Sequence, residues 1–350
     1  MRKVGIVAGI VAIVCLLVGS LSCAPAGPSS LIMGVGKEGS FAYVNGVAFS
    51  RVVNTNLPDV EIDVSSRVGY NTCYIIIGEG KGELDLCSSE TETMCQLYRN
   101  EGEFANVPKD NMIYAGVFGW PFQVFVVTMA DRDDINSFSD LAGKKVCPGP
   151  AGTAVRPLGI IIFDDIAQVW DKVEEVQFGS MMDYADALKS GALDACIGYT
   201  AGSGVPSMVK NYDAKCDLKV IPFNDEELNR MAKIPSFIQI STPAKQIFAQ
   251  DVGVDPIISG APVGGFAFAR HVNTDVVYEI IKCWWEHQDE LVELVPQVST
   301  FRENGEYLNN AGMDAISLVP IPIHPGAAKY YKERGWWKDN WVEGKVTPLK

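Results

Sequence analysis

The chain has 350 residues, of which 47% are hydrophobic and 21% are charged, and its net charge at neutral pH is −14. So acidic a body argues against nucleic acid as a partner, because binding to phosphates needs a basic surface. A chain of this length is too long for one compact core and predicts two domains.

The first 22 residues have the order of a secretory signal peptide. Arg2 and Lys3 precede an apolar run over residues 4–18, and small residues follow it. Cys23 comes after Leu21-Ser22, which predicts cleavage before Cys23 and attachment of a lipid to its thiol. We therefore expect an exported protein of the periplasm or of the outer face of the cell membrane, tethered by flexible residues 23–30.

Two alternatives to the lipid anchor stay open. Lipoprotein signals usually carry Leu where this chain has Ser20, and residues 24–26 offer an ordinary A-x-A cleavage site. Residues 4–22 are also just long enough to span a bilayer if they are not removed.

The cysteines beyond the leader predict small buried residues, with at most one disulfide. They contain no C-x-x-C pair, and most lie in apolar strand-like or helical segments. Cys196 and Cys216 are the candidates for a bridge, since both flank strand-like segments of one region.

Strands and helices alternate along the chain, as in a largely parallel sheet flanked by helices. The first series has strands at residues 31–34, 60–65, 84–88 and 112–117, with helices at residues 43–54, 71–78 and 91–100. The second series has strands at residues 144–147, 175–178 and 193–197, with helices at residues 153–166 and 181–190. A long helix is expected over residues 274–294.

Two extended apolar runs, residues 123–129 and 265–270, are interpreted as crossover strands between two α/β domains. The first domain then holds residues 31–125 and 266–350, and the second holds residues 126–265. Ligand clefts in such sheets lie beyond the carboxyl ends of the strands, where loops meet helix N-termini.

Three polar loops of the first domain meet that description. Residues 34–43 follow the first strand and open a helix; they fit G-x-G-x-x-G, but export argues against a dinucleotide site. The loop with Ser66, Arg67 and Asn71 either offers hydroxyls, N–H groups and a guanidinium to a carboxylate or is a capped helix start with a solvated Arg. In the third loop Ser89 and Glu90 are candidate ligand contacts, but Ser89 or Thr91 can equally be a plain helix N-cap.

Two further loops come from the second domain. Gly152 and Thr153 lie in a small-residue turn whose N–H groups converge, and Arg156 stands one turn into the next helix, unless it forms a surface ion pair. Tyr199 and Thr200 follow the strand at residues 193–197, where they either face the cleft or form a turn with a packed Tyr.

The stretch Pro-Ile-His-Pro-Gly-Ala-Ala-Lys-Tyr-Tyr-Lys-Glu-Arg-Gly-Trp-Trp at residues 322–337 resembles the carboxyl-terminal motif of TAXI-type solute-binding proteins. The Ala-Gly-Thr turn at residues 151–153 and the Gly-Ala-Leu-Asp-Ala segment at residues 191–195, with Val-Pro at residues 205–206, are similar to that family as well. The resemblance covers residues 34–337.

This resemblance implies a two-domain clamshell of the periplasmic-binding-protein type, which captures a small carboxylate or an amino acid, such as a glutamate-like ligand. It also implies delivery of the solute to integral membrane subunits of a tripartite ATP-independent (TRAP) transporter. In the family a glycine-rich stretch leading to an aromatic residue lies near the ligand, which nominates Ser40, Phe41 and Tyr43 here. The same resemblance favours Asn71.

Neither a cofactor, a metal nor catalytic machinery is predicted. The three histidines have no paired metal-ligand spacing, a G-x-S-x-G elbow is absent, and no carboxylates form a recognisable acid/base pair. A ligand sensor that presents a solute to a membrane receptor remains an alternative function, and an enzyme acting in the cleft is less favoured.

Overall fold

A computed structural model describes residues 29–349, except residues 68, 108–112, 152 and 154. The predicted signal peptide, Cys23, most of the tether and Gly152 therefore lie outside the described residues. Within the described part, no helix combines the length and the apolar character that crossing a membrane requires.

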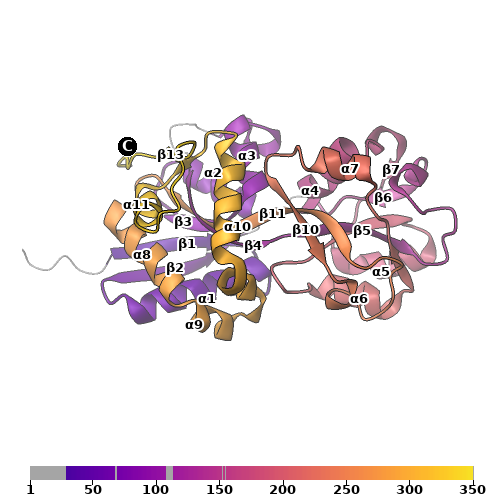
Figure 1. Ribbon diagram of the computed structural model, residues 1–350, viewed down its shortest axis with the longest axis horizontal. Helices are drawn as coiled ribbons and strands as arrows, with labels where there is room; N and C mark the ends of the chain where they lie inside the picture. The colour runs from indigo at the N-terminus through magenta and orange to yellow at the C-terminus, as the bar shows by residue number, and fades with distance from the viewer. Residues whose placement is uncertain (1–28, 68, 108–112, 152, 154, 350) are drawn as a thin grey trace, which may run out of the picture.

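Two β-sheets organise the described chain into two halves, joined near the middle of the molecule (Figure 1). The first sheet has eight strands and the second has five in the described residues. The strands of the first sheet are β1 (Ser29–Val35), β2 (Val60–Ser66), β3 (Leu86–Glu90), β4 (Ile113–Pro121), β10 (Phe237–Thr242), β11 (Ile257–Ala269), β12 (Pro322–Ile323) and β13 (Val342–Glu343). Those of the second are β5 (Val124–Met129), β6 (Lys145–Cys147), β7 (Glu174–Glu175), β8 (Ala195–Tyr199) and β9 (Leu218–Val220).

The strands that run between the halves are antiparallel to their neighbours, whereas the others pair in parallel. Strand β1 pairs in parallel with β2 and β3, and β6 pairs in parallel with β7 and β8. By contrast, β11 is antiparallel to β3, β4 and β10, and β5 is antiparallel to β8 and β9. The sheets are thus mixed at the crossovers and parallel elsewhere.

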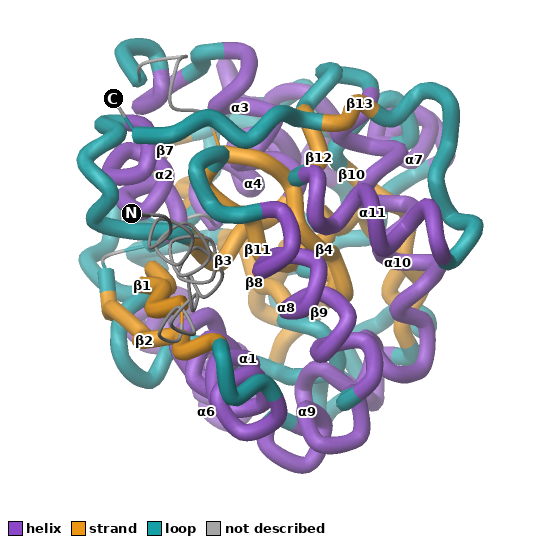
Figure 2. Tube along the Cα trace, turned by 90° about the vertical axis from the view of Figure 1, so that its left-hand side faces the viewer, coloured by secondary structure: helices purple, strands orange, loops and turns teal. Residues whose placement is uncertain are grey.

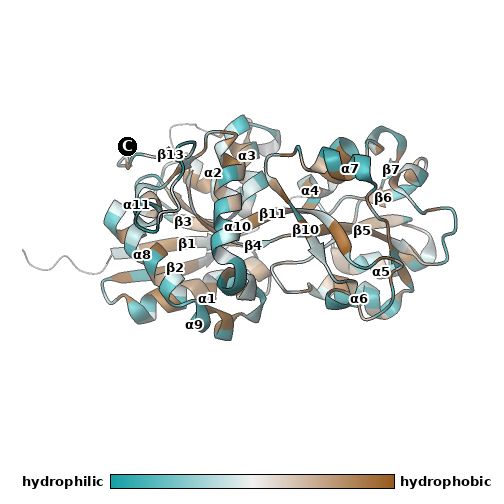
Figure 3. Cartoon of the chain, viewed as in Figure 1, coloured by the Kyte–Doolittle hydropathy of each residue, from teal (hydrophilic) through white to brown (hydrophobic). Residues whose placement is uncertain are grey.

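Helices cover both sheets and bury their apolar faces against them. The helices of the first half are α1 (Phe41–Asn56), α2 (Tyr70–Gly78), α3 (Thr91–Arg99), α8 (Thr274–Glu286), α9 (Gln288–Leu294), α10 (Ser299–Ser317) and α11 (Pro325–Glu333). Those of the second are α4 (Val155–Ile161), continued by a π-helical turn (Ile162–Ile166), α5 (Tyr184–Ser190), α6 (Ser207–Lys215) and α7 (Asp225–Met231). In Figure 3 hydrophilic colour lies on outward turns of helices such as α6 and α10, and hydrophobic colour lies on strands between the helices.

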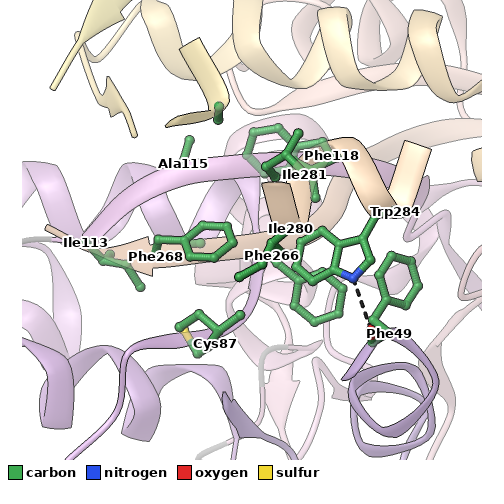
Figure 4. Packing of buried hydrophobic residues seen from close by; sticks show 14 of the residues in the cluster. Phe49, Cys87, Ile113, Ala115, Phe118, Phe266, Phe268, Ile280, Ile281 and Trp284 are labelled. Atoms are coloured by element: carbon green, nitrogen blue, oxygen red, sulfur yellow. Dashed lines mark hydrogen bonds between the residues drawn. The ribbon is translucent and has the colours of Figure 1, made fainter. Parts of the chain in front are cut away.

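The core of the first half is built around aromatic side chains. Trp284 of α8 is fully buried against Phe49, Phe266 and Phe268, and its indole N–H donates to the backbone oxygen of Phe49 at 3.0 Å (Figure 4). Helix α11 packs against α8 on the outer side of this half (Figure 2). The tail motif thus closes the first core and lies outside the contact between the halves.

One sequence prediction about local structure is wrong, and one is confirmed. The long helix expected at residues 274–294 is two helices, because His287 leaves helical geometry with φ −113° and ψ 34°. The prediction of small buried cysteines is confirmed for Cys196 and Cys216, which are free buried thiols. The candidate bridge between them is not formed, and the Cys216 thiol donates to the Ala185 carbonyl at 3.4 Å.

Candidate ligand cleft

A cavity of about 230 Å³ lies where the two halves meet; we call it the front cavity. The turns that form it follow β1, β3 and β6, so the cavity lies beyond the carboxyl ends of parallel strands from both sheets. It is lined by Gly36, Lys37, Ser40, Phe41, Ala42, Gly69, Glu90, Phe122, Thr153, Val155, Leu158 and Tyr199.

The start of α1 forms one wall of the front cavity. Ser40 is the N-cap of α1, and its hydroxyl oxygen accepts from the Tyr43 N–H at 3.2 Å. Gly39 has φ +79°, a conformation that favours glycine, and lets the chain turn sharply into the helix. The positive end of the α1 dipole therefore faces the cavity, beside the exposed Lys37.

Aromatic rings form the floor of the front cavity. Phe41 meets Phe122 edge to face at 6.0 Å between ring centroids, and Phe122 lies 6.5 Å from Tyr199. Gly264 of β11 makes room for this arrangement, because a Cβ atom there would lie 2.5 Å from Cε2 of Phe122. The floor is therefore apolar and is fixed by close packing at the crossover.

Glu90 is a buried carboxylate in the cavity wall and the N-cap of α3. Its oxygens accept from the backbone N–H of Glu92 at 2.7 Å and of Thr93 at 2.6 Å, and from the Thr93 hydroxyl. Burial raises the pKa of Glu90 to about 7, against the opposing effect of the hydrogen bonds from Thr93. The Glu90 carboxylate therefore accepts hydrogen bonds mainly from the start of α3, and few of its acceptor positions remain for a ligand in the cavity.

Thr153, Val155 and Leu158 form the wall contributed by the second half. The Thr153 hydroxyl donates to the Pro150 carbonyl at 2.7 Å and so shapes the turn before α4. Arg156, one residue beyond Val155, makes an ion pair with Glu175 of β7 at 2.6 Å and does not line the cavity.

Five of the predicted site residues line the front cavity: Ser40, Phe41, Glu90, Thr153 and Tyr199. Three other described candidates do not line it and form hydrogen bonds with neighbouring groups. The Ser66 hydroxyl donates to the Gly36 carbonyl at 3.2 Å, Arg67 donates to the Ser66 carbonyl at 3.1 Å, and Ser89 shares a hydrogen bond with the Tyr74 hydroxyl.

The remaining candidates lie elsewhere. Asn71 is buried near the start of α2, Tyr43 is in the first turn of α1, and neither lines the front cavity. Thr200 lines a different cavity from its neighbour Tyr199.

Sequence reasoning missed Lys37, Val155 and Leu158 as lining residues. Lys37 could have been found, since it stands in the glycine-rich turn after the first strand. The other side chains could not, because their exposure depends on how the halves meet. Within the described residues, no group of three or more His, Cys, Asp or Glu side chains is arranged to hold a metal ion.

Comparisons with known proteins match nearly the whole chain. A family model described as the NMT1-like family matches residues 33–335. Among solved structures, a TctC solute binding protein from Polaromonas has a TM-score of 0.51 at 15% identity, with 87% of this chain and 99% of that chain covered.

Two further structures are less similar in shape. A putative L-cystine ABC transporter protein from Listeria monocytogenes is 18% identical, with a TM-score of 0.44 and coverage of 76% of this chain and 94% of that one. A probable amino-acid ABC transporter extracellular-binding protein from Bacillus subtilis is 16% identical, with a TM-score of 0.46 and coverage of 76% and 96%. The two-domain α/β fold predicted from the sequence is confirmed, and at these identities the likeness concerns the fold alone.

Proposed function

The chain belongs to the NMT1-like family, and from that premise we propose that it is an extracytoplasmic solute-binding protein. The observation that carries the proposal is the front cavity, which draws its walls from both halves of the molecule. A solute held between two lobes can stabilise their closure, which is how a hinged protein couples binding to a change of shape. The hinge would be the crossovers at residues 121–124 and in β11.

The ligand that this cavity favours is a small organic anion or amino acid with one carboxylate. Lys37 is the one cation among the described lining residues, and it stands beside the N-terminus of α1. The floor of Phe41, Phe122 and Tyr199 suits an apolar body. A second carboxylate, as in a glutamate-like ligand, would meet the Thr153 hydroxyl and the acidic Glu90, so we rank such ligands lower.

We further propose that the protein is of the TAXI type and delivers its solute to integral membrane TRAP subunits. The motifs at residues 151–153 and 322–337 support this assignment. The leader supports export, and Cys23 supports a lipid anchor. The sensor alternative differs in its genetic setting: genes for large membrane transport subunits beside this one would support transport, and a receptor gene in their place would support sensing.

The experiment that tests the binding role starts with protein that has been unfolded and refolded, so that carried-over solute is removed. Thermal unfolding is then followed with leucine, phenylalanine, 4-methyl-2-oxopentanoate, glutamate, 2-oxoglutarate and glucose. A ligand at 1,000 times its dissociation constant stabilises by about 4 kcal/mol, which raises Tm by several degrees.

A rise in Tm with one class of monocarboxylate supports the proposal and its ligand class. A rise with glutamate or 2-oxoglutarate alone supports the binding role but contradicts the apolar ligand. If the protein chemically converts the solute that binds, the protein is an enzyme. If no compound raises Tm, the small-carboxylate assignment fails.

A further inference from the structure

A second cavity, of about 410 Å³, lies behind the crossover, and we call it the rear cavity. Pro121 and Gln123 line it, whereas Phe122 between them lines the front cavity. Likewise Thr200 lines the rear cavity and Tyr199 the front one. Since neighbours in an extended chain point to opposite faces, the two cavities lie back to back across the same two segments.

Both halves of the molecule form walls of the rear cavity. Helix α10 contributes Glu303 and Tyr307, the loop at residues 201–205 contributes Ser203, and β10 contributes Gln239. In Figure 1 α10 stands beside the junction of the halves, with β10 and β11 passing between them. The Ser203 N–H donates to the Gln297 carbonyl at 3.0 Å, which joins the second half to the turn before α10.

Gln123 gives the rear cavity an acceptor that has no protein partner among the described residues. The side chain is 1% exposed, and its Nε2 donates to the Ile257 carbonyl at 3.0 Å. Because a carbonyl can only accept, this bond fixes the orientation of the amide and turns Oε1 away from Ile257. Oε1 then lacks a hydrogen bond within the described residues, and leaving a buried acceptor unpaired is unfavourable.

One ordered water could satisfy that oxygen but would not fill the space. A water molecule takes up about 30 Å³, a small part of this cavity. The cavity therefore has room for an organic molecule that carries a hydrogen-bond donor at one end.

The charges of the rear cavity select the class of that molecule. Glu303 is the one charged side chain among the described lining residues; its carboxylate lies 3.9 Å from Nη2 of Arg302, which does not itself line the cavity. Tyr307, 64% exposed, adds the face of an aromatic ring, which attracts cations. Ile238, Ile240 and Leu308 supply apolar contacts for a carbon chain. The lining residues therefore favour a cation over an anion, in contrast to the front cavity with Lys37.

We propose that the rear cavity is a second ligand site, which binds a small aliphatic amine in its protonated form. Its ammonium group donates to Gln123 Oε1 or to the Glu303 carboxylate, and its carbon chain lies along Ile238 and Leu308. The site differs from the solute cleft in position, in charge and in ligand class, so it does not depend on the proposed function.

Calorimetric titration of the purified protein with 1-aminobutane tests the site, with 1-butanol and butyrate as uncharged and anionic probes of the same chain length. Saturable binding is expected for the amine alone. Glu303→Gln should weaken amine binding about fivefold to tenfold by removing the charge, and Tyr307→Leu about twofold to fivefold by removing the ring. Both side chains are exposed, so neither change should alter Tm appreciably.

Glu306→Gln is the matched control, because Glu306 is exposed on the same helix and does not line the rear cavity. Amine binding that is weakened by Glu303→Gln and unaffected by Glu306→Gln supports the site. The proposal is overturned if no saturable amine binding occurs, if the two variants behave alike, or if 1-butanol binds as tightly as the amine.

Discussion

His324 is an imidazole that the fold keeps neutral in its interior. The side chain is fully buried; its Nε2 donates to the Val272 carbonyl at 3.1 Å, and its Nδ1 accepts from the Gly326 N–H at 3.2 Å as the N-cap of α11. Burial lowers the pKa of His324 from 6.5 to about 4, although the bond to Val272 opposes this effect. The bond from Gly326 requires an unprotonated Nδ1, so protonation of the ring breaks the cap, whereas Nε2 can still donate to Val272.

The pH dependence of stability follows from this pKa. Between pH 6.5 and pH 4 the unfolded chain binds a proton at His324 that the folded protein does not bind, so stability falls as the pH falls. The loss from this residue is roughly 3 kcal/mol. His324→Asn keeps an acceptor for the Gly326 N–H but does not titrate.

Urea unfolding of the wild type and of His324→Asn between pH 4 and pH 7.5 measures the effect. The difference in unfolding free energy between them should shrink as the pH falls, because only the wild type loses stability through proton uptake by His324 on unfolding. A difference that does not vary with pH would show that His324 titrates normally in the fold.

Lys37 is the residue on which the carboxylate preference of the front cavity rests. Lys37→Gln should raise the dissociation constant of a bound monocarboxylate about tenfold, the effect of losing one hydrogen bond to a charged group. Lys233→Gln makes the same change at another exposed lysine, away from the cavity, and should leave affinity unchanged. Calorimetry with the ligand found by thermal unfolding measures the dissociation constant of each variant. Equal affinities for both variants would show that Lys37 does not contact the ligand.

Arg156 illustrates what single residues in a sequence do not reveal. Its place after the Ala-Gly-Thr turn made it a candidate for the ligand, and the same reasoning left a surface ion pair open. Its partner, Glu175, lies in β7, which pairs in parallel with β6. Glu175 is 28 positions beyond Cys147, the last residue of β6, so the pairing of the strands brings together residues that are distant in sequence. No local sequence pattern predicts an ion pair that forms only when two strands meet in the fold. A ligand contact by Arg156 stays a prediction.

At the scale of elements, strand β11 depends on a glycine pair where it meets β4. The register of the two strands shifts between Gly264 and Gly265. A Cβ atom at Gly265 would lie 1.8 Å from the Val117 carbonyl oxygen, much closer than any real contact. The close approach of the backbones therefore requires glycine at this point of the crossover.

Gly265→Ala should destabilise the protein by about 2–3 kcal/mol, because the sheet must move to accept the methyl group. Gly179→Ala is the control: nothing lies within 4 Å of its added Cβ, so its effect should be small. Chemical denaturation measures both. A Gly265→Ala protein as stable as the Gly179→Ala protein would contradict the close pairing of β11 with β4.

Elements with a local pattern were the ones that the sequence predicted well. The period of apolar residues predicted α1, α2 and α3 to within a few residues. The single long helix over residues 274–294 failed, since nothing in its composition marks the break at His287. Helix α10 was not predicted; Asn304 leaves helical geometry within it, with φ −135°.

At the scale of the whole molecule, the proposed hinge would change the two cavities in opposite directions. Closing the lobes over the front cavity about a hinge at the crossover would draw the rear walls apart. A bulky side chain in the rear cavity therefore resists the open form and favours the closed, ligand-bound form.

Gln239→Trp places such a wedge, since Gln239 is exposed on β10 and lines the rear cavity. Solute affinity at the front cavity should rise about threefold to tenfold. This corresponds to a change of roughly 1 kcal/mol, in favour of the closed form, in the free-energy difference between the open and closed forms. Gln177→Trp adds the same bulk at an exposed position that does not line the rear cavity and should have no effect. Weaker or unchanged binding in Gln239→Trp would contradict a hinge at the crossover.

The two-lobed fold was predictable because alternating strands and helices and two crossover runs are local patterns. The composition of the cleft was predictable only in part. Ser40 and Thr153 follow strands in the sequence, but the way Tyr199 and Thr200 divide between two cavities is set by the strand direction at the crossover. The relation of the lobes is a property that no single segment encodes.

The buried thiols have a practical consequence. The cysteines of the described chain are free and buried, and they are divided between the lobes: Cys73, Cys87, Cys95 and Cys283 lie in the first, and Cys147, Cys196 and Cys216 in the second. A thiol reagent reaches each of them only when its surroundings open. Pulse labelling followed by peptide mass spectrometry would thus read out, without any engineered probe, whether the lobes come apart together or one after the other.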